Sequence, residues 1–156
     1  MDELKKYGIH HVGLVVPDLD ATVQHWKDYY GVTDFKYWTF NPMKAWVYGQ
    51  PVEEYKLNVA MGTIHPGGCN VEIISPITEY GYHYDFVKSG KTGLNHICFS
   101  TDNYDSTRAH FLEKCGTFLF EAEIEDDIVG YRRCFYAEDT SGDFVYEIRE
   151  VPYFRK

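Results

Sequence analysis

The chain has 156 residues, of which 44% are hydrophobic and 25% are charged. This length and composition fit one globular domain or two small packed modules, and they exclude a disordered chain. The net charge of −9 argues against DNA, RNA or an anionic membrane surface as a partner, because each of these requires a basic protein surface.

The N-terminus and the cysteines indicate the compartment. Residues 1–6 are charged and lack the apolar core of a signal peptide, and no apolar run is long enough to span a bilayer. The four cysteines are widely spaced and form no Cys-x-x-Cys motif, which predicts reduced thiols rather than a zinc finger or a redox motif. We therefore expect a cytoplasmic protein.

An internal repeat organises the sequence. A shift of 85 positions places Gly8–Leu14 on Gly93–Phe99 and Asp20–Trp26 on Asp105–Phe111. Chance alone would give about one or two identities over such a stretch. The identical pairs are Gly8 and Gly93, His11 and His96, Asp20 and Asp105, Thr22 and Thr107, His25 and His110, and Gly31 and Gly116.

A second match needs a shift of 75 positions, which places Gly67–Ile73 on Gly142–Ile148. The smaller shift means that the first half carries ten extra residues between its two matched blocks. We place these residues around Asn41–Glu54, where two prolines and a glycine predict irregular chain.

Hydrophobic periodicity predicts the same order of elements in both halves. In the first half we expect a strand at Ile9–Val16, a helix at Ala21–Tyr30 and strands at Phe35–Phe40, Lys56–Met61 and Asn70–Ile74. In the second half we expect a strand at Leu94–Ser100, a helix at Tyr104–Lys114 and strands near Thr117–Glu121, Tyr131–Tyr136 and Phe144–Arg149.

These elements predict an α+β fold of two tandem βαβββ modules, residues 8–76 and 93–150, joined by a linker at 77–92 that holds a short helix at Tyr84–Lys88. The strands would form a curved, mostly antiparallel sheet with the helices on its outer face. The inner face would then enclose a cleft.

Alternation along the strands assigns the His and Glu of the second module to the inner face. The apolar Ile97 and Phe99 share the face that packs under the helix, so His96 points the other way. Glu147 likewise lies opposite the apolar Ile148. Their counterparts in the first module follow the same pattern.

Four residues related by the repeat, His11, Glu72, His96 and Glu147, are thus expected on the concave face. A glutamate in the centre of an apolar strand is costly to bury alone. We predict that the four side chains bind one divalent metal ion. Two imidazoles and two carboxylates suit Ni²⁺, Co²⁺, Zn²⁺, Mn²⁺ or Fe²⁺, and they leave coordination positions open for water or substrate.

Three stretches carry a resemblance to a known family: Ile9–Asp20, Gly93–Phe99 and Gly142–Ile148. They resemble the opening, middle and closing strands of the vicinal oxygen chelate superfamily, which includes glyoxalase I, methylmalonyl-CoA epimerase, extradiol dioxygenases and the bleomycin and fosfomycin resistance proteins. The resemblance spans nearly the whole chain and implies the same four metal ligands. The layout is most similar to the epimerase group, whereas Glu72 is more like glyoxalase I.

The resemblance implies a metal-dependent isomerase, epimerase or lyase that moves a proton next to a metal-bound carbonyl or thioester of a small-molecule substrate. Glu147 would be the base, with Glu72 as its counterpart in the repeat, and Glu54 or Glu53 would be a second base in an epimerase-like reaction. Arg132 or Arg133 would hold a substrate carboxylate or phosphate. A homodimer is common in the family, so we expect one here.

Three other activities within the superfamily stay open at this point. They are an extradiol dioxygenase with two His and one carboxylate on Fe²⁺, a thiol transferase, and a metal-free binding protein of the bleomycin-resistance kind. The fourth ligand candidate, Glu72, argues against the first, and the joint presence of all four residues argues against the last.

Overall fold

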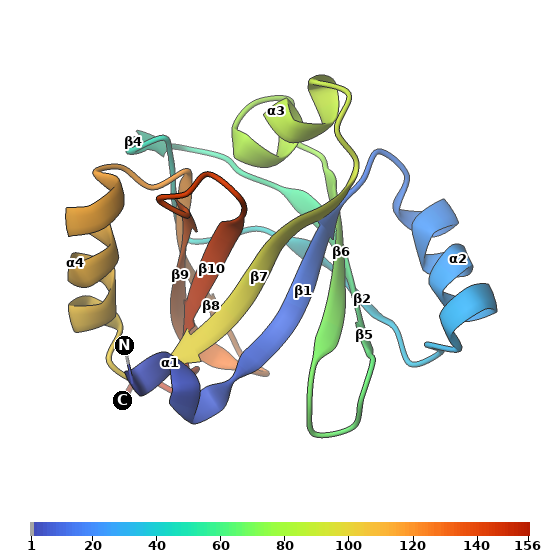
Figure 1. Cartoon of the computed structure of the whole chain (residues 1–156), viewed down its shortest axis with the longest axis horizontal. Coiled ribbons are helices and arrows are strands. Elements are labelled where there is room, and N and C mark those ends of the chain that lie inside the picture. Colours follow the sequence, from blue (N-terminus) through green and yellow to red (C-terminus); the bar gives the residue numbers. More distant parts are fainter. Residues whose placement is uncertain (1) are drawn as a thin grey trace.

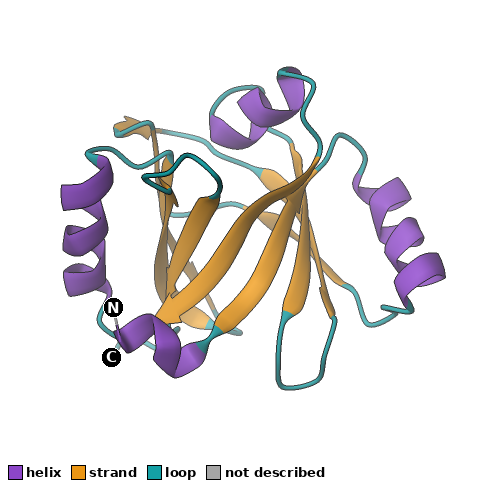
Figure 2. Ribbon diagram, viewed as in Figure 1, coloured by secondary structure: helices purple, strands orange, loops and turns teal. Residues whose placement is uncertain are grey.

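One ten-stranded sheet and four helices make up the fold of the computed structural model, which describes residues 2–156 (Figures 1 and 2). The helices are α1 (Asp2–Tyr7), α2 (Leu19–Tyr30), α3 (Tyr82–Lys88) and α4 (Tyr104–Cys115). The strands are β1 (Ile9–Val15), β2 (Lys36–Phe40), β3 (Lys44–Val47), β4 (Gln50–Val52), β5 (Leu57–Thr63), β6 (Asn70–Pro76), β7 (Gly93–Thr101), β8 (Phe120–Asp126), β9 (Gly130–Glu138) and β10 (Val145–Glu150).

The strand order β2-β5-β6-β1-β7-β10-β9-β8-β3-β4 places two equivalent four-strand sets side by side, joined by the antiparallel pair β1 and β7. In each set the first and last strands pair in parallel, β1 with β6 and β7 with β10, and all other pairs are antiparallel. The predicted α+β class with a curved, mostly antiparallel sheet is confirmed. The predicted module boundaries stay a prediction.

The segment Asn41–Glu54, expected to be irregular, instead forms the β3–β4 hairpin. Its turn, Tyr48-Gly49, has positive φ at both residues (48° and 80°), as a two-residue hairpin turn requires. Pro51 lies on β4, the last strand of the sheet, where a missing N–H costs no ladder bond. The prolines and glycine that predicted irregular chain therefore mark a turn and an edge strand.

The chain between β2 and this hairpin connects the two ends of the sheet. Strand β2 is the first strand in the order, yet β3, only three residues later, pairs with β8 near the other end. The sheet must therefore be strongly curled, and the rings of Phe40 on β2 and Phe120 on β8 lie 6.1 Å apart across it. The concave side is consequently an enclosed interior.

Apolar clusters on both faces hold the curled sheet. On the outer face, α2 packs over Val71 and Ile73 of β6, and α4 packs over Phe135 and Ile148. Figure 1 shows these two helices flanking the sheet, with α3 over one end. A third cluster, which includes Phe120 and Tyr136, fills the interior.

Two local differences from the predicted elements have simple causes. Strand β8 begins at Phe120 rather than near Thr117, because its register is set by the hairpin with β9. Helix α1 was not predicted, and it is held by the burial of Leu4 in the cluster under α4. None of the helices within residues 2–156 is long and apolar enough to cross a membrane.

Candidate metal centre

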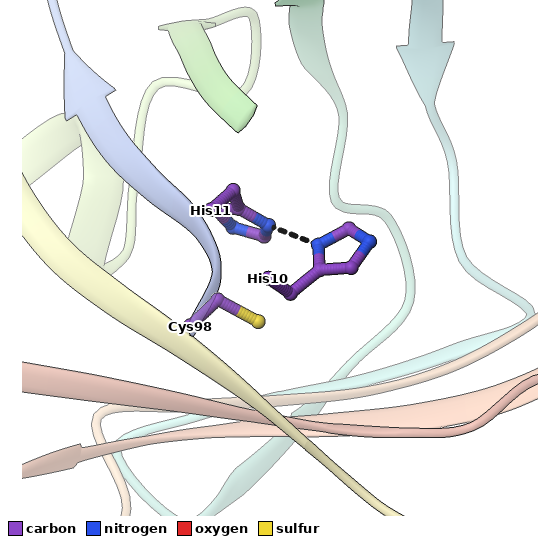
Figure 3. Close-up of side chains that lie close together, drawn as sticks. All are labelled: His10, His11 and Cys98. Carbon is purple, nitrogen blue, oxygen red and sulfur yellow. Dashed lines mark hydrogen bonds between the residues drawn. The ribbon is translucent and has the colours of Figure 1, made fainter. Parts of the chain in front are cut away.

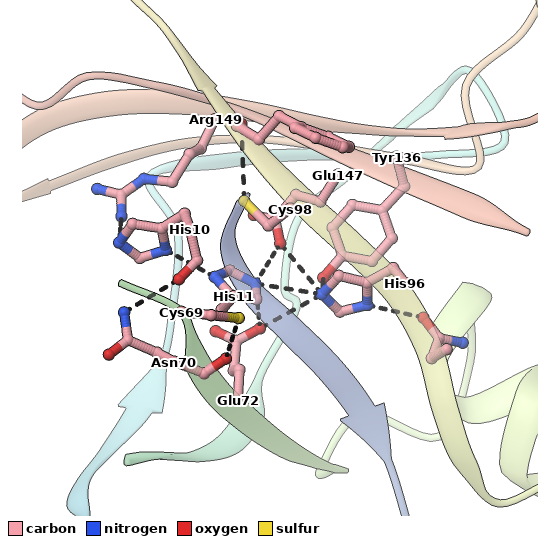
Figure 4. A network of polar contacts seen from close by, with 12 residues as sticks. His10, His11, Cys69, Asn70, Glu72, His96, Cys98, Tyr136, Glu147 and Arg149 are labelled. Atoms are coloured by element: carbon pink, nitrogen blue, oxygen red, sulfur yellow. Dashed lines mark hydrogen bonds and ion pairs between the residues drawn. The ribbon is translucent and has the colours of Figure 1, made fainter. Parts of the chain in front are cut away.

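His11, Glu72, His96 and Glu147 converge on the concave face of four adjacent strands (Figure 4). The register explains how. Gly13 on β1 lies opposite Glu72 on β6, and Cys98 on β7 lies opposite Glu147 on β10. Each Glu is thus paired with the position two residues after the His of its own half, which puts both side chains at one level of the inner face.

The atoms of this cluster are close to one another. The Nε2 atom of His11 lies 2.9 Å from Oε2 of Glu147 and 3.1 Å from Oε2 of Glu72. The Nε2 atom of His96 lies 3.2 Å and 3.5 Å from the same two oxygens, and the two Nε2 atoms are 3.4 Å apart. All four atoms fall within 4.8 Å of one another.

These separations fit a divalent ion. Bonds of about 2.0–2.2 Å to nitrogen and carboxylate oxygen place two ligands about 2.9 Å apart at a right angle and about 3.4 Å apart at the tetrahedral angle. The residues present therefore fit the metal that the donor set implies.

Burial and mutual attraction set the charges of the cluster. Burial alone would raise the pKa of Glu72, but His11 and His96 lower it to about 2. Burial would also raise the pKa of Glu147, and the same two imidazoles hold it well below its usual range. Against burial, Cys98 and the two carboxylates raise the pKa of His11, and the carboxylates raise that of His96.

A pH dependence follows for the metal-free protein. The lowered pKa values of Glu72 and Glu147 stabilise the fold above the unfolded value of about 4.5, and this contribution is lost as pH falls through the folded values. The raised pKa values of His11 and His96 stabilise it below about 6.5, and this contribution is lost as pH rises through the folded values. At alkaline pH, where His11 and His96 have lost their protons, a bound metal ion would supply the positive charge that the two carboxylates need.

We therefore expect the difference in Tm between Co²⁺-loaded and metal-free protein to grow between about pH 6 and about pH 9, because protons compete with the metal for the imidazole nitrogens. Thermal unfolding with and without Co²⁺ across this range measures it. His65, an exposed histidine on the β5–β6 loop, provides the control His65→Ala, which should leave the pH profile unchanged. A difference that is constant with pH would contradict the assignment.

Neighbouring side chains orient both imidazoles. Asn95 accepts a hydrogen bond from Nδ1 of His96 through its Oδ1 (2.9 Å), which leaves Nε2 of His96 free to bind a metal. Nδ1 of His11 lies 2.8 Å from Nδ1 of His10. Such outer partners fix the tautomer and ring orientation of a metal-binding histidine.

A second group, His10, His11 and Cys98, also lies close enough to hold an ion (Figure 3). The Cys98 thiol is fully buried, and burial together with the Glu147 carboxylate raises its pKa to about 12. A thiol must lose its proton to bind metal, so this group is the weaker site. Of the two groups, the four-residue cluster is the better candidate for a metal ion.

Tyr136 is a functional candidate that the sequence analysis missed. It lies on β9 opposite Glu147, is 4% exposed, and places its hydroxyl 3.4 Å from Nε2 of His96. Burial and the Glu147 charge raise its pKa well above 10, so the hydroxyl remains a hydrogen-bond donor. No spacing signal marks it among 14 tyrosines.

Glu54, Arg132 and Arg133, the other residues with a predicted role, lie outside the four-residue cluster. Glu54 precedes β5 with a side chain 63% exposed, and it pairs with Lys56 (2.8 Å) rather than joining the cluster. Both Arg132 and Arg133 line the cavity at the cluster. Arg133 pairs with Glu150, and Arg132 pairs with Asp126 (2.8 Å).

A cavity of about 230 Å³ opens onto the cluster. It adjoins a wider hollow of about 530 Å³ near the molecular surface, and the two share a mainly apolar wall. The shared residues are Trp38, Phe40, Ile124, Val129 and Arg132. Three of the four cluster residues, His11, Glu72 and Glu147, line the inner cavity, so a small molecule can reach the cluster through an apolar passage.

A curled sheet that encloses a cluster of two His and two Glu able to hold a divalent ion defines the class of protein to which this chain is compared. A family model described as the Glyoxalase/Bleomycin resistance protein/Dioxygenase superfamily matches residues 10–135, so the chain belongs to this superfamily. The matched segment includes His11, Glu72 and His96 and ends before Glu147. A search of curated proteins found no match.

Solved structures share the fold. A methylmalonyl-CoA epimerase variant from Streptomyces coelicolor in complex with 2-nitronate-propionyl-CoA has a TM-score of 0.63 and 22% identity, covering 93% of this chain and 97% of that one. The epimerase from Mycobacterium tuberculosis has a TM-score of 0.61 and 17% identity, covering 94% and 88%. A mutant 4-hydroxymandelate synthase from Streptomyces coelicolor has a TM-score of 0.57 and 16% identity, covering 96% and 50%.

Proposed function

We propose that this protein is a divalent-metal-dependent isomerase, epimerase or lyase that moves a proton at the carbon next to a carbonyl or thioester. The observation that carries the proposal is the convergence of four ligand atoms, at 2.9–3.5 Å from their neighbours, at the inner end of an apolar cavity. A bound divalent ion would act as a Lewis acid on the carbonyl oxygen. The retention of Glu72 as a fourth ligand candidate favours this reaction over that of a dioxygenase with two His and one carboxylate.

Glu147 is the proposed base. It contributes Oε2 to the cluster, so its second oxygen can take the proton from the substrate carbon and return it to the same or the adjacent carbon. Glu147 also lines the cavity, as does Glu72. Glu54 has no part in this proposal, because it is exposed and paired with Lys56.

Tyr136 would donate a hydrogen bond to the substrate oxygen on which negative charge develops. We expect Tyr136→Phe to lower the exchange rate by about 100-fold, as loss of one such donor does elsewhere, while metal content stays unchanged. Proton exchange and metal content measure the two effects. Tyr104→Phe is the control, since Tyr104 is buried in the cluster under α4. Equal rates in Tyr136→Phe and wild type would contradict this role.

The direct test is deuterium incorporation at the substrate carbon. Protein purified without a polyhistidine tag is analysed for bound metal by mass spectrometry, and loaded and metal-free samples are screened in D₂O. The substrates are 2-oxoaldehyde thiol adducts and 2-methylmalonyl-type thioesters. We expect about one ion per chain and exchange only in loaded protein. A protein that binds none of the five candidate ions would refute the proposal.

A further inference from the structure

Arg149 and His10 form a polar pair beside the candidate metal centre (Figure 4). Arg149 lies on β10 two residues after Glu147, on the same face of the strand, and both Arg149 and His10 line the cavity. Strict alternation would turn His10 to the opposite face from His11. A register irregularity between Ile9 and His11 in the pairing of β1 with β7 instead lets both imidazoles face inward, as bulges next to active sites do.

If His11 binds a metal through Nε2, proton counting leaves this pair without an acceptor. As a metal ligand, His11 has its lone pair on Nε2 and its proton on Nδ1. That proton points at Nδ1 of His10, 2.8 Å away, which must accept it. His10 therefore carries its own proton on Nε2, and this atom lies 2.5 Å from Nη1 of Arg149.

Arginine donates hydrogen bonds and accepts none. Two donors, Nε2–H of His10 and Nη1–H of Arg149, therefore face each other, and both require an acceptor. A carboxylate oxygen has two lone pairs and can serve both. The metal-bound form of His11 thus calls for an oxyanion at this point of the cavity.

The charges around Arg149 support the same conclusion. Of the five arginines, the other four pair with carboxylates: Arg108 with Glu121, Arg132 with Asp126, Arg133 with Glu150 and Arg155 with Glu125. Within residues 2–156, no carboxylate forms an ion pair with Arg149, whose Nη1 atom lies 2.5 Å from Nε2 of His10. Arg149 is therefore the arginine whose charge is left for a ligand.

We propose that Arg149 and Nε2–H of His10 bind a carboxylate of the substrate, which makes the substrate a small organic acid. Its carbonyl would lie at the four-residue cluster and its apolar body against Trp38, Phe40 and Val129 of the cavity wall. This inference rests on the proposed function, because the proton of His10 is placed by the ligand role of His11. It differs from the earlier expectation that Arg132 or Arg133 holds the substrate anion.

The test uses Co²⁺-loaded protein and hydroxamates, which chelate metal ions through two oxygens. The probes are benzohydroxamate and its 2-, 3- and 4-carboxy derivatives, with Kd measured by calorimetry and by the visible spectrum of Co²⁺. In wild type, at least one carboxylated isomer should bind about tenfold more tightly than benzohydroxamate, since a charge-assisted hydrogen bond contributes about this much. Arg149→Gln should abolish this advantage and leave the Kd of benzohydroxamate unchanged.

Arg108→Gln is the matched control, because Arg108 lies on α4 on the outer face. It should keep the full advantage of the carboxylated probe. The subsite is overturned if no carboxylated probe binds wild type more tightly than benzohydroxamate, or if Arg149→Gln keeps the tighter binding. In either case, binding of benzohydroxamate itself would still support the metal centre. If Co²⁺ and benzohydroxamate both fail to bind, the proposed function fails, and the subsite that rests on it fails as well.

Discussion

Replacing Glu147 by glutamine is expected to slow substrate proton exchange by about 100-fold or more, even at saturating metal. The amide oxygen can still reach the ion, but it has no charge with which to accept a proton, and loss of a general base costs this much or more. Glu147 is 8% exposed and contacts both candidate imidazole ligands. Deuterium incorporation on metal-saturated protein measures the rate.

Two further variants separate the base from the ligands. His96→Ala should lose most of the bound metal, because its fully buried Nε2 is one of the four converging atoms. Glu72→Gln should weaken metal binding but retain more exchange than Glu147→Gln once metal is saturating. A Glu147→Gln protein that exchanges at the wild-type rate would show that another group is the base.

Gly13→Ala should destroy the metal centre without touching a ligand. A Cβ at Gly13 would lie 2.0 Å from Cε1 and 2.1 Å from Nε2 of His96. The ring cannot yield, because it packs against Tyr136 with centroids 4.6 Å apart and is hydrogen-bonded to Asn95 at 2.9 Å. Overpacking of this kind costs about 1–3 kcal/mol, which is a Tm loss of about 2–12 °C for a domain of this size.

Metal content and thermal unfolding measure the two effects of Gly13→Ala. The matched control is Gly68→Ala, since Gly68 lies in the exposed β5–β6 loop. A Cβ there would meet the ring of the exposed His65 at 2.9 Å, which can turn away, and the His65 backbone oxygen at an ordinary 3.4 Å. That variant should bind one ion and keep its Tm. A Gly13→Ala protein with full metal occupancy would mean that the His96 ring is not a ligand in this position.

Most of the fold could be predicted from the sequence because of the internal repeat. Strand and helix periods recur at a fixed spacing around His11 and His96, so each half supports the assignment of the other. The hairpin at Asn41–Glu54 occurs once and has no such support. Its pairing partner, β8, lies far along the chain, and a local pattern of prolines and glycines contains no information about a partner at that distance.

The four candidate ligands could be picked out from the sequence for the same reason, because each half has a His and a Glu at the same positions of its repeated strands. Tyr136, His10 and Arg149 could not be picked out in this way. Tyr136 has no counterpart in the repeat, and His10 reaches the cavity only because a register irregularity breaks the alternation on which the face assignment depended. The role proposed for Arg149 rests on its geometry with His10, which no spacing in the sequence encodes.

The pairing of β3 with β8 changes what the repeat can do. Trp46 pairs with Glu121 across 75 positions of sequence, so the first half donates a strand to the sheet of the second. A chain cut in the linker would not yield two equal halves, because one fragment would hold the β3–β4 hairpin without its neighbour β8, and the other would have an uncovered edge at β8. The two halves therefore depend on each other, because neither half completes its sheet alone. Such long-range strand pairing favours slow, cooperative folding of the whole chain.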